Sequence, residues 1–162
     1  MDYDVPATPE LGTTEAKPAP ADATEATTES VQTIAARLDR GEPFVHNFDG
    51  DKREQYKKVA IACGSAPMKS TESTGRVVDL QYYFAHRVLM TDPKTGEEFD
   101  QLRIVIFDKN GDTYSFASAG IADSLNLIIG VFGNGPWSEP MEHKITSSRT
   151  NSGRNMLSLV PV

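Results

Sequence analysis

Short runs rich in β-branched and aromatic residues, separated by turn clusters, make up most of the chain after residue 56. This pattern, with runs of four to eight residues bounded by Gly, Pro, Asn and Asp, is typical of an all-β domain. We predict strands at Lys57 to Cys63, Val77 to Thr91, Gln101 to Phe107, Thr113 to Ser118, Met141 to Ser148 and Asn155 to Val160.

Three of the connections have the chemistry of chain reversals. Segment 92–96 reads Asp-Pro-Lys-Thr-Gly, and Asn110-Gly111 tolerates the positive φ that a tight hairpin requires. We therefore predict antiparallel hairpins at both places. Asn151-Ser-Gly153 joins the last two strands in the same way.

Helical periodicity occurs in two segments. Between residues 30 and 40 the apolar residues recur at i, i+3, i+4 and i+7, and Gly41 follows as a stop signal. This short amphipathic helix is marginal alone, so docking on its own domain and docking on a partner are both open. Ile121 to Phe132 has the same spacing and ends at Gly133. Segment 41–56 is polar and is predicted to be a connector.

The predicted order is three antiparallel strands, one helix and a two-stranded hairpin, with one extra strand in front. This is the order of an OB-fold, a five-stranded Greek-key barrel that binds oligonucleotides on its face. The predicted fold class is therefore all-β with one or two helices. Because this class also carries protein and sugar ligands, the fold alone does not define the function.

Charge divides the chain into two parts. Residues 1–43 hold nine Asp or Glu against three Lys or Arg, whereas residues 44–162 hold fourteen against thirteen. Residues 1–30 have hardly any large apolar side chain and cannot offset the entropy of ordering, so we predict disorder there. The predicted organisation is an acidic tail over 1–43, with the short helix near 30–40, and an OB-like domain over 44–162.

Cellular location follows from what the chain contains. A lone Cys63 excludes an intrachain disulfide, the N-terminus lacks the basic start and apolar run of a secretory signal, and no apolar run is long enough to cross a bilayer. We expect a cytoplasmic protein with no membrane partner.

Several segments resemble the single-stranded DNA-binding proteins of phages that copy linear genomes by protein priming, the phi-29-like group and its relatives. The segment Ile106-Phe-Asp-Lys-Asn-Gly-Asp-Thr-Tyr114-Ser is similar to the family's I-F-x-x-D-G-x-x-Y-S. The ending Ser148-Arg-Thr-Asn-Ser-Gly153-Arg-Asn-Met-Leu-Ser158-Leu resembles S-S-K-G-N-x-F-x-S-L, and Gly75-Arg-Val-Val-Asp79 resembles D-G-T-I-I-E. The resemblance covers roughly 57–162, and its strength lies in the order and spacing of several moderate matches.

The resemblance implies that Tyr114 is a DNA-stacking residue. It also shows departures: His86 and Pro93 stand where aromatic family residues are expected, and 137–140 is an insertion. The family role that it implies is coating and protecting single strands exposed during phage DNA replication, with single-stranded DNA as the partner and replication proteins such as a DNA polymerase as further partners.

Binding single strands without reading sequence requires flat side chains for base stacking and cations along the phosphates. Strand alternation places Tyr83 with Arg87 on the more polar face, and Arg103 on the face opposite the core residues of its strand. These three residues form one candidate surface. The full candidate set is Tyr114, Tyr83, Arg87, Arg103, Tyr82, His86, Phe107, Arg149 and Arg154.

Each candidate also has a purely structural interpretation. The tyrosines could pack the barrel, and Arg149 and Arg154 could be a solvated hairpin tip. Weaker phosphate-binding candidates are Arg53, Lys57, Lys58 and Lys69. Trp137 is expected to cover the end of the preceding helix rather than to stack on a base.

Catalytic and metal-binding motifs fail on inspection. The segment 108–112 hints at a calcium loop, but its sixth and twelfth positions hold Thr113 and Ala119 instead of Gly and Glu. Cys63 and the three histidines lack the paired spacing of a zinc site. We therefore expect no cofactor, no metal and no enzymatic activity. The alternative to DNA binding is a protein-interaction module that recruits a partner through the acidic tail, which the nearly neutral domain charge keeps open.

Overall fold

The computed structural model describes residues 33–64 and 70–162. In chain order the elements are α1 (Ile34–Asp39), β1 (Phe44–His46), α2 (Lys52–Gly64), α3 (Ser70–Ser73), β2 (Val77–Thr91), β3 (Glu98–Asp108), β4 (Thr113–Phe116), α4 (Ala119–Phe132), β5 (Met141–Arg149) and β6 (Asn155–Pro161). The predicted disorder of residues 1–30 and the candidate Lys69 lie outside these ranges. No helix in the described ranges is long and apolar enough to cross a membrane.

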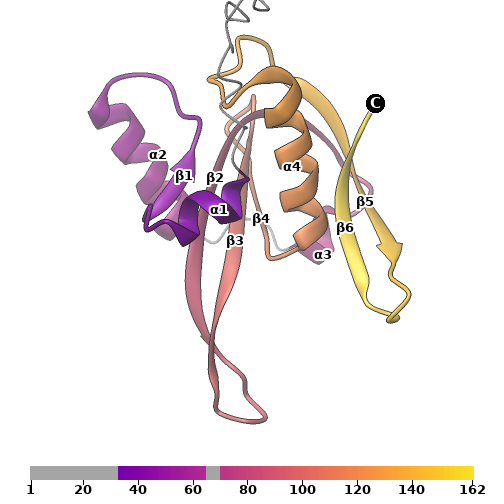
Figure 1. The fold of residues 1–162 in the computed structure, drawn as a ribbon. Helices are drawn as coiled ribbons and strands as arrows, with labels where there is room; N and C mark the ends of the chain where they lie inside the picture. Colours follow the sequence, from indigo (N-terminus) through magenta and orange to yellow (C-terminus); the bar gives the residue numbers. More distant parts are fainter. Residues whose placement is uncertain (1–32, 65–69) are drawn as a thin grey trace, which may run out of the picture. The chain divides into compact units, whose positions relative to one another are not determined.

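One antiparallel sheet organises the domain (Figure 1). Its order is β4-β3-β2-β5-β6, and β1 also pairs with β2. The long strand β2 is shared: its first residues, Val77 to Leu80, pair with β5, and a later stretch, Phe84 to His86, pairs with β1. Along most of its length β2 also pairs with β3, and this β2–β3 hairpin extends beyond the rest of the sheet (Figure 1).

The hairpins occur where turn chemistry predicts them. Gly96 and Gly111 have positive φ angles of 73° and 88°, which an L side chain rarely adopts. The Asp108 amide donates to the Asp112 carbonyl, and both side-chain oxygens of Asp108 accept bonds, one from the Asp79 amide and one from Asn110. This segment is the predicted turn. The predicted strand Val77–Thr91 and the predicted helix before Gly133 are confirmed as β2 and α4.

One predicted strand is wrong. Segment 57–63 lies inside helix α2, whose first turn is capped by the Asp51 side chain, which accepts from the amides of Arg53 and Glu54 at 2.8 and 2.9 Å. The alternating Val59 and Ile61 suggested a strand, but the Asp cap and the Lys, Arg, Glu, Gln and Ala residues of this segment favour a helix. The strand that precedes β2 is β1, inside the segment predicted to be a connector.

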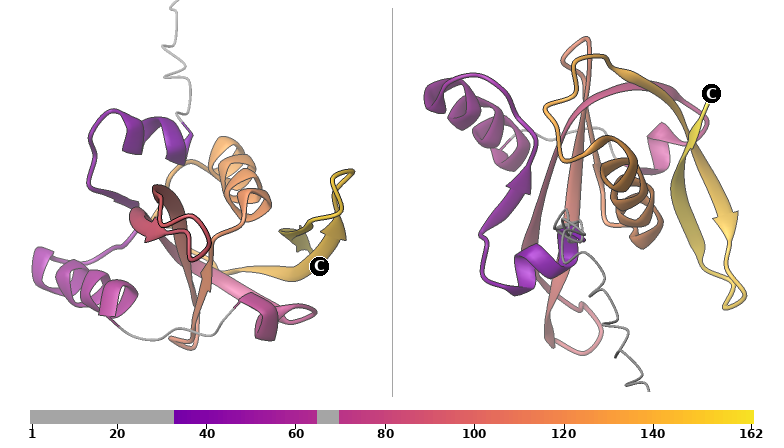
Figure 2. Two further views of the ribbon diagram at one scale, coloured as in Figure 1. Left: turned by 90° about the horizontal axis from the view of Figure 1, so that it is seen from below. Right: turned by 45° about the horizontal axis from the view of Figure 1, so that its top comes forward.

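Helices α1 and α4 cover one face of the sheet and close the hydrophobic core. Ile34 and Leu38 of α1 are buried in the same cluster as Ile121 and Leu125 of α4. The Ile34 amide donates to the Asn126 side chain at 3.0 Å, so α4 satisfies one of the amides that helix α1 leaves unpaired at its start. The short helix predicted near residues 30–40 therefore docks on its own domain. Figure 2 shows α1 and α4 on one side of β2 and β3, and α2 on the other.

The sheet is OB-like, as predicted, but it does not close into a barrel. Strands β4 and β6 are its two ends, and α4 lies along the free edge of β6. The Ser118 hydroxyl accepts from the Leu157 amide at 3.1 Å, and the Ser124 hydroxyl accepts from the Leu159 amide at 3.1 Å. A Cβ on Gly120 would lie 2.3 Å from the Leu157 carbonyl oxygen, so this approach requires glycine. Two helix hydroxyls thus replace strand-to-strand bonds at the closing edge.

Candidate nucleic-acid interface

The β2–β3 hairpin presents two faces of different chemistry. The core face carries Tyr83 and Ala85 of β2 with Ile104 and Ile106 of β3, beneath α1 and α4. We call the opposite face the aromatic face. Its residues come from β1, the loop after it, β2 and β3: Phe44, His46, Phe48, Tyr82, Phe84, His86, Arg103, Val105 and Phe107. Registered pairs Tyr82–Phe107, Phe84–Val105 and His86–Arg103 place the β2 and β3 members side by side.

A layer of rings forms the base of the aromatic face. Phe48 stacks on Phe84 with centroids 6.2 Å apart and meets Phe107 edge to face at 5.2 Å. His46 lies against Phe48 at 4.8 Å. Phe48, Phe84 and Phe107 are all buried. Such ring pairs add to the stability that area burial supplies, so this layer is a rigid base.

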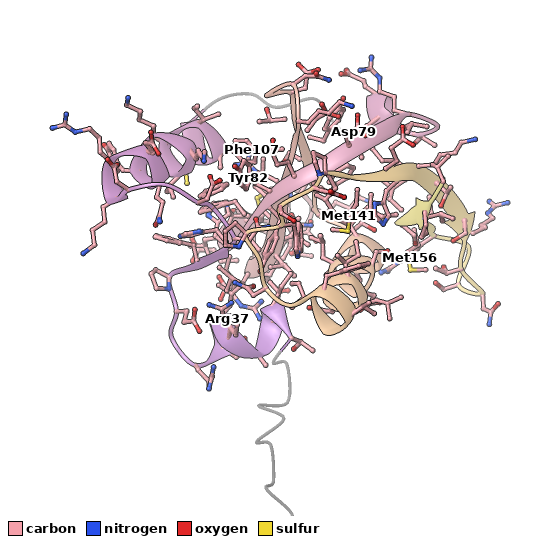
Figure 3. All side chains as sticks on the ribbon, turned by 90° about the horizontal axis from the view of Figure 1, so that it is seen from above. Arg37, Asp79, Tyr82, Phe107, Met141 and Met156 are labelled. Carbon is pink, nitrogen blue, oxygen red and sulfur yellow. The ribbon has the colours of Figure 1, made fainter. Side chains whose placement is uncertain are left out.

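Accessible rings and two cations form the rim. Phe44 is 37% exposed, and Tyr82, His86 and Arg103 are half-buried. Lys58 reaches from α2 over the Tyr82 ring, with Nζ 4.3 Å from the centroid. In Figure 3, Tyr82 and Phe107 lie next to each other beside α2, whereas Arg37 lies away from them on α1. The rim therefore combines stacking surfaces with positive charge.

Asp49 ties Lys58 to Tyr82. Its Oδ1 accepts from Lys58 Nζ at 2.8 Å and from the Tyr82 hydroxyl at 2.6 Å. The Lys58 bond, followed by the Tyr82 bond, lowers the pKa of Asp49. Burial, with the Asp49 bond second, raises the pKa of Tyr82 to about 12. One carboxylate oxygen of Asp49 thus bridges the Lys58 ammonium and the Tyr82 hydroxyl.

Arg103 and His86 form the second polar pair of the rim. Arg103 Nε donates to the Ser115 hydroxyl at 2.9 Å, and no described residue binds its terminal nitrogens. Burial, followed by the nearby Arg103 charge, lowers the pKa of His86. The His86 Nε2 atom is buried and has no hydrogen-bond partner among the described residues. At neutral pH the pair therefore presents one arginine cation beside a neutral imidazole.

The structure brings four of the predicted site residues together on the aromatic face. Tyr82, His86 and Arg103 are on its rim, while Phe107 belongs to the buried ring layer, where its ring faces Phe48 instead of solvent.

Two tyrosines are not where the sequence analysis placed them. Tyr83 is fully buried in the core, and its hydroxyl donates to Asn134. Tyr114 is 4% exposed and packs in the same cluster. For Tyr83 the cause is a register shift between Leu80 and Tyr82, which moves the later residues of β2 to the other face. The alternation assumed no such bulge, so the predicted polar face was wrong.

Strand alternation predicted one surface of Tyr83, Arg87 and Arg103, but the structure places these residues on two faces. Arg87 is on the same face as Tyr83, as predicted, and pairs with Asp39 of α1. Arg103 is paired in register with His86 and so lies on the aromatic face. Arg87 and Arg103 are therefore on opposite sides of the same hairpin.

Arg149 and Arg154 lie at the β5–β6 turn, away from the aromatic face. Arg149 Nε donates to the Gly153 carbonyl at 3.4 Å. Arg154 lines a hollow of about 520 Å³ together with Ser118, Ala119 and Leu157, at the opening between β4 and β6. Neither arginine is therefore part of the aromatic face.

Sequence reasoning missed the contribution of β1. Phe44, His46 and Phe48 alternate with Val45 and Asn47, and this period of two was the available signal for a strand with one aromatic side. The strand itself has only three residues, so this signal is short. Trp137 behaves as predicted: it is buried, and its Nε1 donates to the Gly133 carbonyl at the end of α4.

Proteins that bind single-stranded nucleic acid on an OB-fold use aromatic rings for base stacking and cations for the phosphates. The aromatic face of this sheet has both. A family model described as "Phage Single-stranded DNA-binding protein", of the phi29 type, matches residues 40–160. The chain belongs to this family of phage single-stranded DNA-binding proteins, and the resemblance noted from the sequence is confirmed. No curated protein and no solved structure matches the chain in the corresponding comparisons. Its function is therefore single-stranded DNA binding in phage replication, and the protein-interaction alternative is not favoured.

Proposed function

We propose that single-stranded DNA lies across the aromatic face and is bound without sequence preference. Bases would stack on the accessible rings Phe44 and Tyr82, and the phosphates would contact Lys58 and Arg103. Stacking on a ring face and pairing with a phosphate are both open to any base, so this chemistry does not read sequence. The observation that carries the proposal is the position of both cations beside rings on one face.

Lys58 is the residue at which DNA would rearrange the protein. Its partner Asp49 has an exposed side chain, so this ion pair is weak in water. An incoming phosphate would exchange with the Asp49 carboxylate and leave Lys58 over the Tyr82 ring. Because Lys58 has an anionic partner before and after the exchange, breaking its ion pair with Asp49 costs little free energy.

The modest number of cations limits the affinity for phosphate alone. Residues 44–162 carry thirteen Lys or Arg against fourteen Asp or Glu, so most binding free energy must come from stacking. We infer that the protein coats and protects exposed single strands and acts without catalysis, in the cytoplasm of the infected host. Replication proteins such as a DNA polymerase are the expected further partners.

Tyr82→Ala tests the proposal. Losing a stacking ring should weaken binding of a short oligo-dT by about 1 to 3 kcal/mol, roughly 5-fold to 150-fold, whereas Tyr82→Phe should retain most of the affinity. Tyr56, which is 71% exposed on the outer side of α2, provides the matched control. Tyr56→Ala should bind the short oligo-dT as the wild type does. Unchanged affinity in a folded Tyr82→Ala protein would remove the aromatic face as the DNA site.

A further inference from the structure

Helix α2 has an inner and an outer side. Lys58, Val59 and Ala62 face the aromatic face and are buried or half-buried. On the other side, at helical spacing, Arg53, Tyr56, Lys57 and Ile61 are all exposed. Between residues 52 and 57 the chain holds three exposed cations and one exposed carboxylate. The outer side of α2 is therefore a basic surface with an aromatic and an aliphatic side chain in it.

The far end of the β2–β3 hairpin has the opposite charge. We call residues 89–100 the hairpin tip. Met90 and Phe99 are cross-strand partners there, and they are 42% and 46% exposed, while neighbouring Leu89 is 63% exposed. Four carboxylates, Asp92, Glu97, Glu98 and Asp100, accompany a single lysine. Such a surface repels phosphate, so its exposed apolar side chains fit a basic protein surface and not DNA.

We infer that the hairpin tip of one protomer docks on the outer side of α2 of the next protomer. The two surfaces match in kind: each carries exposed apolar side chains, one within a net excess of three carboxylates and the other within a net excess of two cations. Figures 1 and 2 show the tip and α2 well separated in the same protomer. The contact therefore joins two different surfaces on two protomers, and a contact of this kind repeats head to tail into a ring or an open chain. We infer the open chain, because it can follow a long single strand.

The direction of this head-to-tail row of protomers agrees with the proposed DNA path, and the inference rests on that path. The aromatic face starts at Lys58 and Tyr82, beside the inner side of α2, and continues to Arg103 and His86 at the base of the extended hairpin. A strand leaving this face at the hairpin would meet the α2 end of the next protomer. Docking of tip on α2 would then align successive aromatic faces and make binding to long single strands cooperative.

Charge reversal of each surface tests this arrangement. One variant carries Glu97→Lys and Glu98→Lys, and the other carries Arg53→Glu and Lys57→Glu. The wild-type protein should associate with increasing concentration in sedimentation, and each variant alone should abolish this association. Each should also lower cooperativity on an oligo-dT several site lengths long, by about tenfold. A variant with Glu139→Lys and Glu142→Lys, both exposed near the start of β5, has the same charge change as the tip variant and should associate normally.

Mixing the two variants provides the decisive result. In an equimolar mixture every tip meets an α2 of opposite charge, so association and cooperativity should return. They should also return in one chain that carries all four substitutions. Failure of both to restore association would overturn the inference.

A short oligo-dT of about eight nucleotides, close to one OB-fold site, separates this inference from the proposed DNA site. Its affinity should change less than about threefold in every one of these variants, because one protomer suffices to bind it. The α2 variant could instead lose much of its short-oligo affinity, and the chain with all four substitutions could fail to recover it. That result would assign the outer side of α2 to DNA. Loss of short-oligo binding in Tyr82→Ala concerns the aromatic face alone and leaves the docking result unaffected.

Discussion

Tyr82 and Tyr83 are adjacent in the sequence but belong to opposite faces of the sheet. Tyr83 is fully buried beneath α1 and α4, where its hydroxyl has a fixed partner in Asn134. Tyr82 is half-buried beside α2, and its hydroxyl donates to the exposed carboxylate of Asp49. The core face is closed by two packed helices. The aromatic face is covered only in part by α2, and only Ala62 of that helix is fully buried. Aromatic residues thus pack the core on one face, whereas the other face combines a buried ring layer with the accessible rings of Phe44 and Tyr82.

The largest effect is expected on the core face. Tyr114→Ala should lower the free energy of unfolding by about 3 to 5 kcal/mol, because a buried ring is replaced by a cavity. DNA affinity should fall only as far as the folded fraction falls. Chemical denaturation and oligo-dT titration of the same sample measure both. A fully stable Tyr114→Ala protein with weakened DNA binding would show that Tyr114 is a ligand residue, as the family resemblance implies.

Gly120 tests how α4 closes the open edge of the sheet. Gly120→Ala should cost about 1 to 3 kcal/mol, because the new methyl group would overlap the Leu157 carbonyl. Gly130, in the same helix with nothing within 4 Å of a Cβ, is the matched control. Gly130→Ala should stabilise the protein by up to about 1 kcal/mol. Equal melting temperatures for the two variants would mean that α4 does not pack tightly on β6.

The smallest effect concerns the histidines of the aromatic face. Burial lowers the pKa of His46 and of His86 from the ordinary value of 6.5. The unfolded chain therefore binds protons near pH 6 more readily than the folded protein does, and the stability that is complete above pH 6.5 is lost as the pH falls. The melting temperature should therefore fall between pH 7 and pH 5. His86→Phe should reduce this drop, and an unchanged drop would exclude His86 as its source.

Local chemistry made much of this fold predictable. The Asp-Pro-Lys-Thr-Gly and Asn-Gly turns, the long alternation of β2 and the spacing of α4 each depend on neighbouring residues, and each was located correctly. Long-range effects were not predictable in this way. A bulge after Leu80 exchanged the two faces for Tyr83, and the three-residue strand β1 is stabilised by its pairing with β2 rather than by its own sequence.

The candidate site was therefore only partly predicted. Tyr82, His86 and Arg103 were named from the sequence and lie on one rim, although the sequence analysis grouped Arg103 with Tyr83 and Arg87. Lys58 was named only as a weak candidate, and its segment was predicted to be a strand. As a helix, that segment carries Lys58 across to the ring of Tyr82.

Arg103 and Arg87 allow the most direct test of the claim that DNA occupies the aromatic face, because they are cations on opposite sides of one hairpin. The measurement is the salt dependence of oligo-dT affinity for Arg103→Gln and Arg87→Gln. The account predicts that Arg103→Gln weakens binding and reduces the magnitude of the slope of log K against log salt by about 0.7, the value for one lost phosphate contact on a single strand. Arg87→Gln should leave affinity and slope unchanged. A reduced slope for Arg87→Gln with a normal slope for Arg103→Gln would place the DNA on the other face and contradict the account.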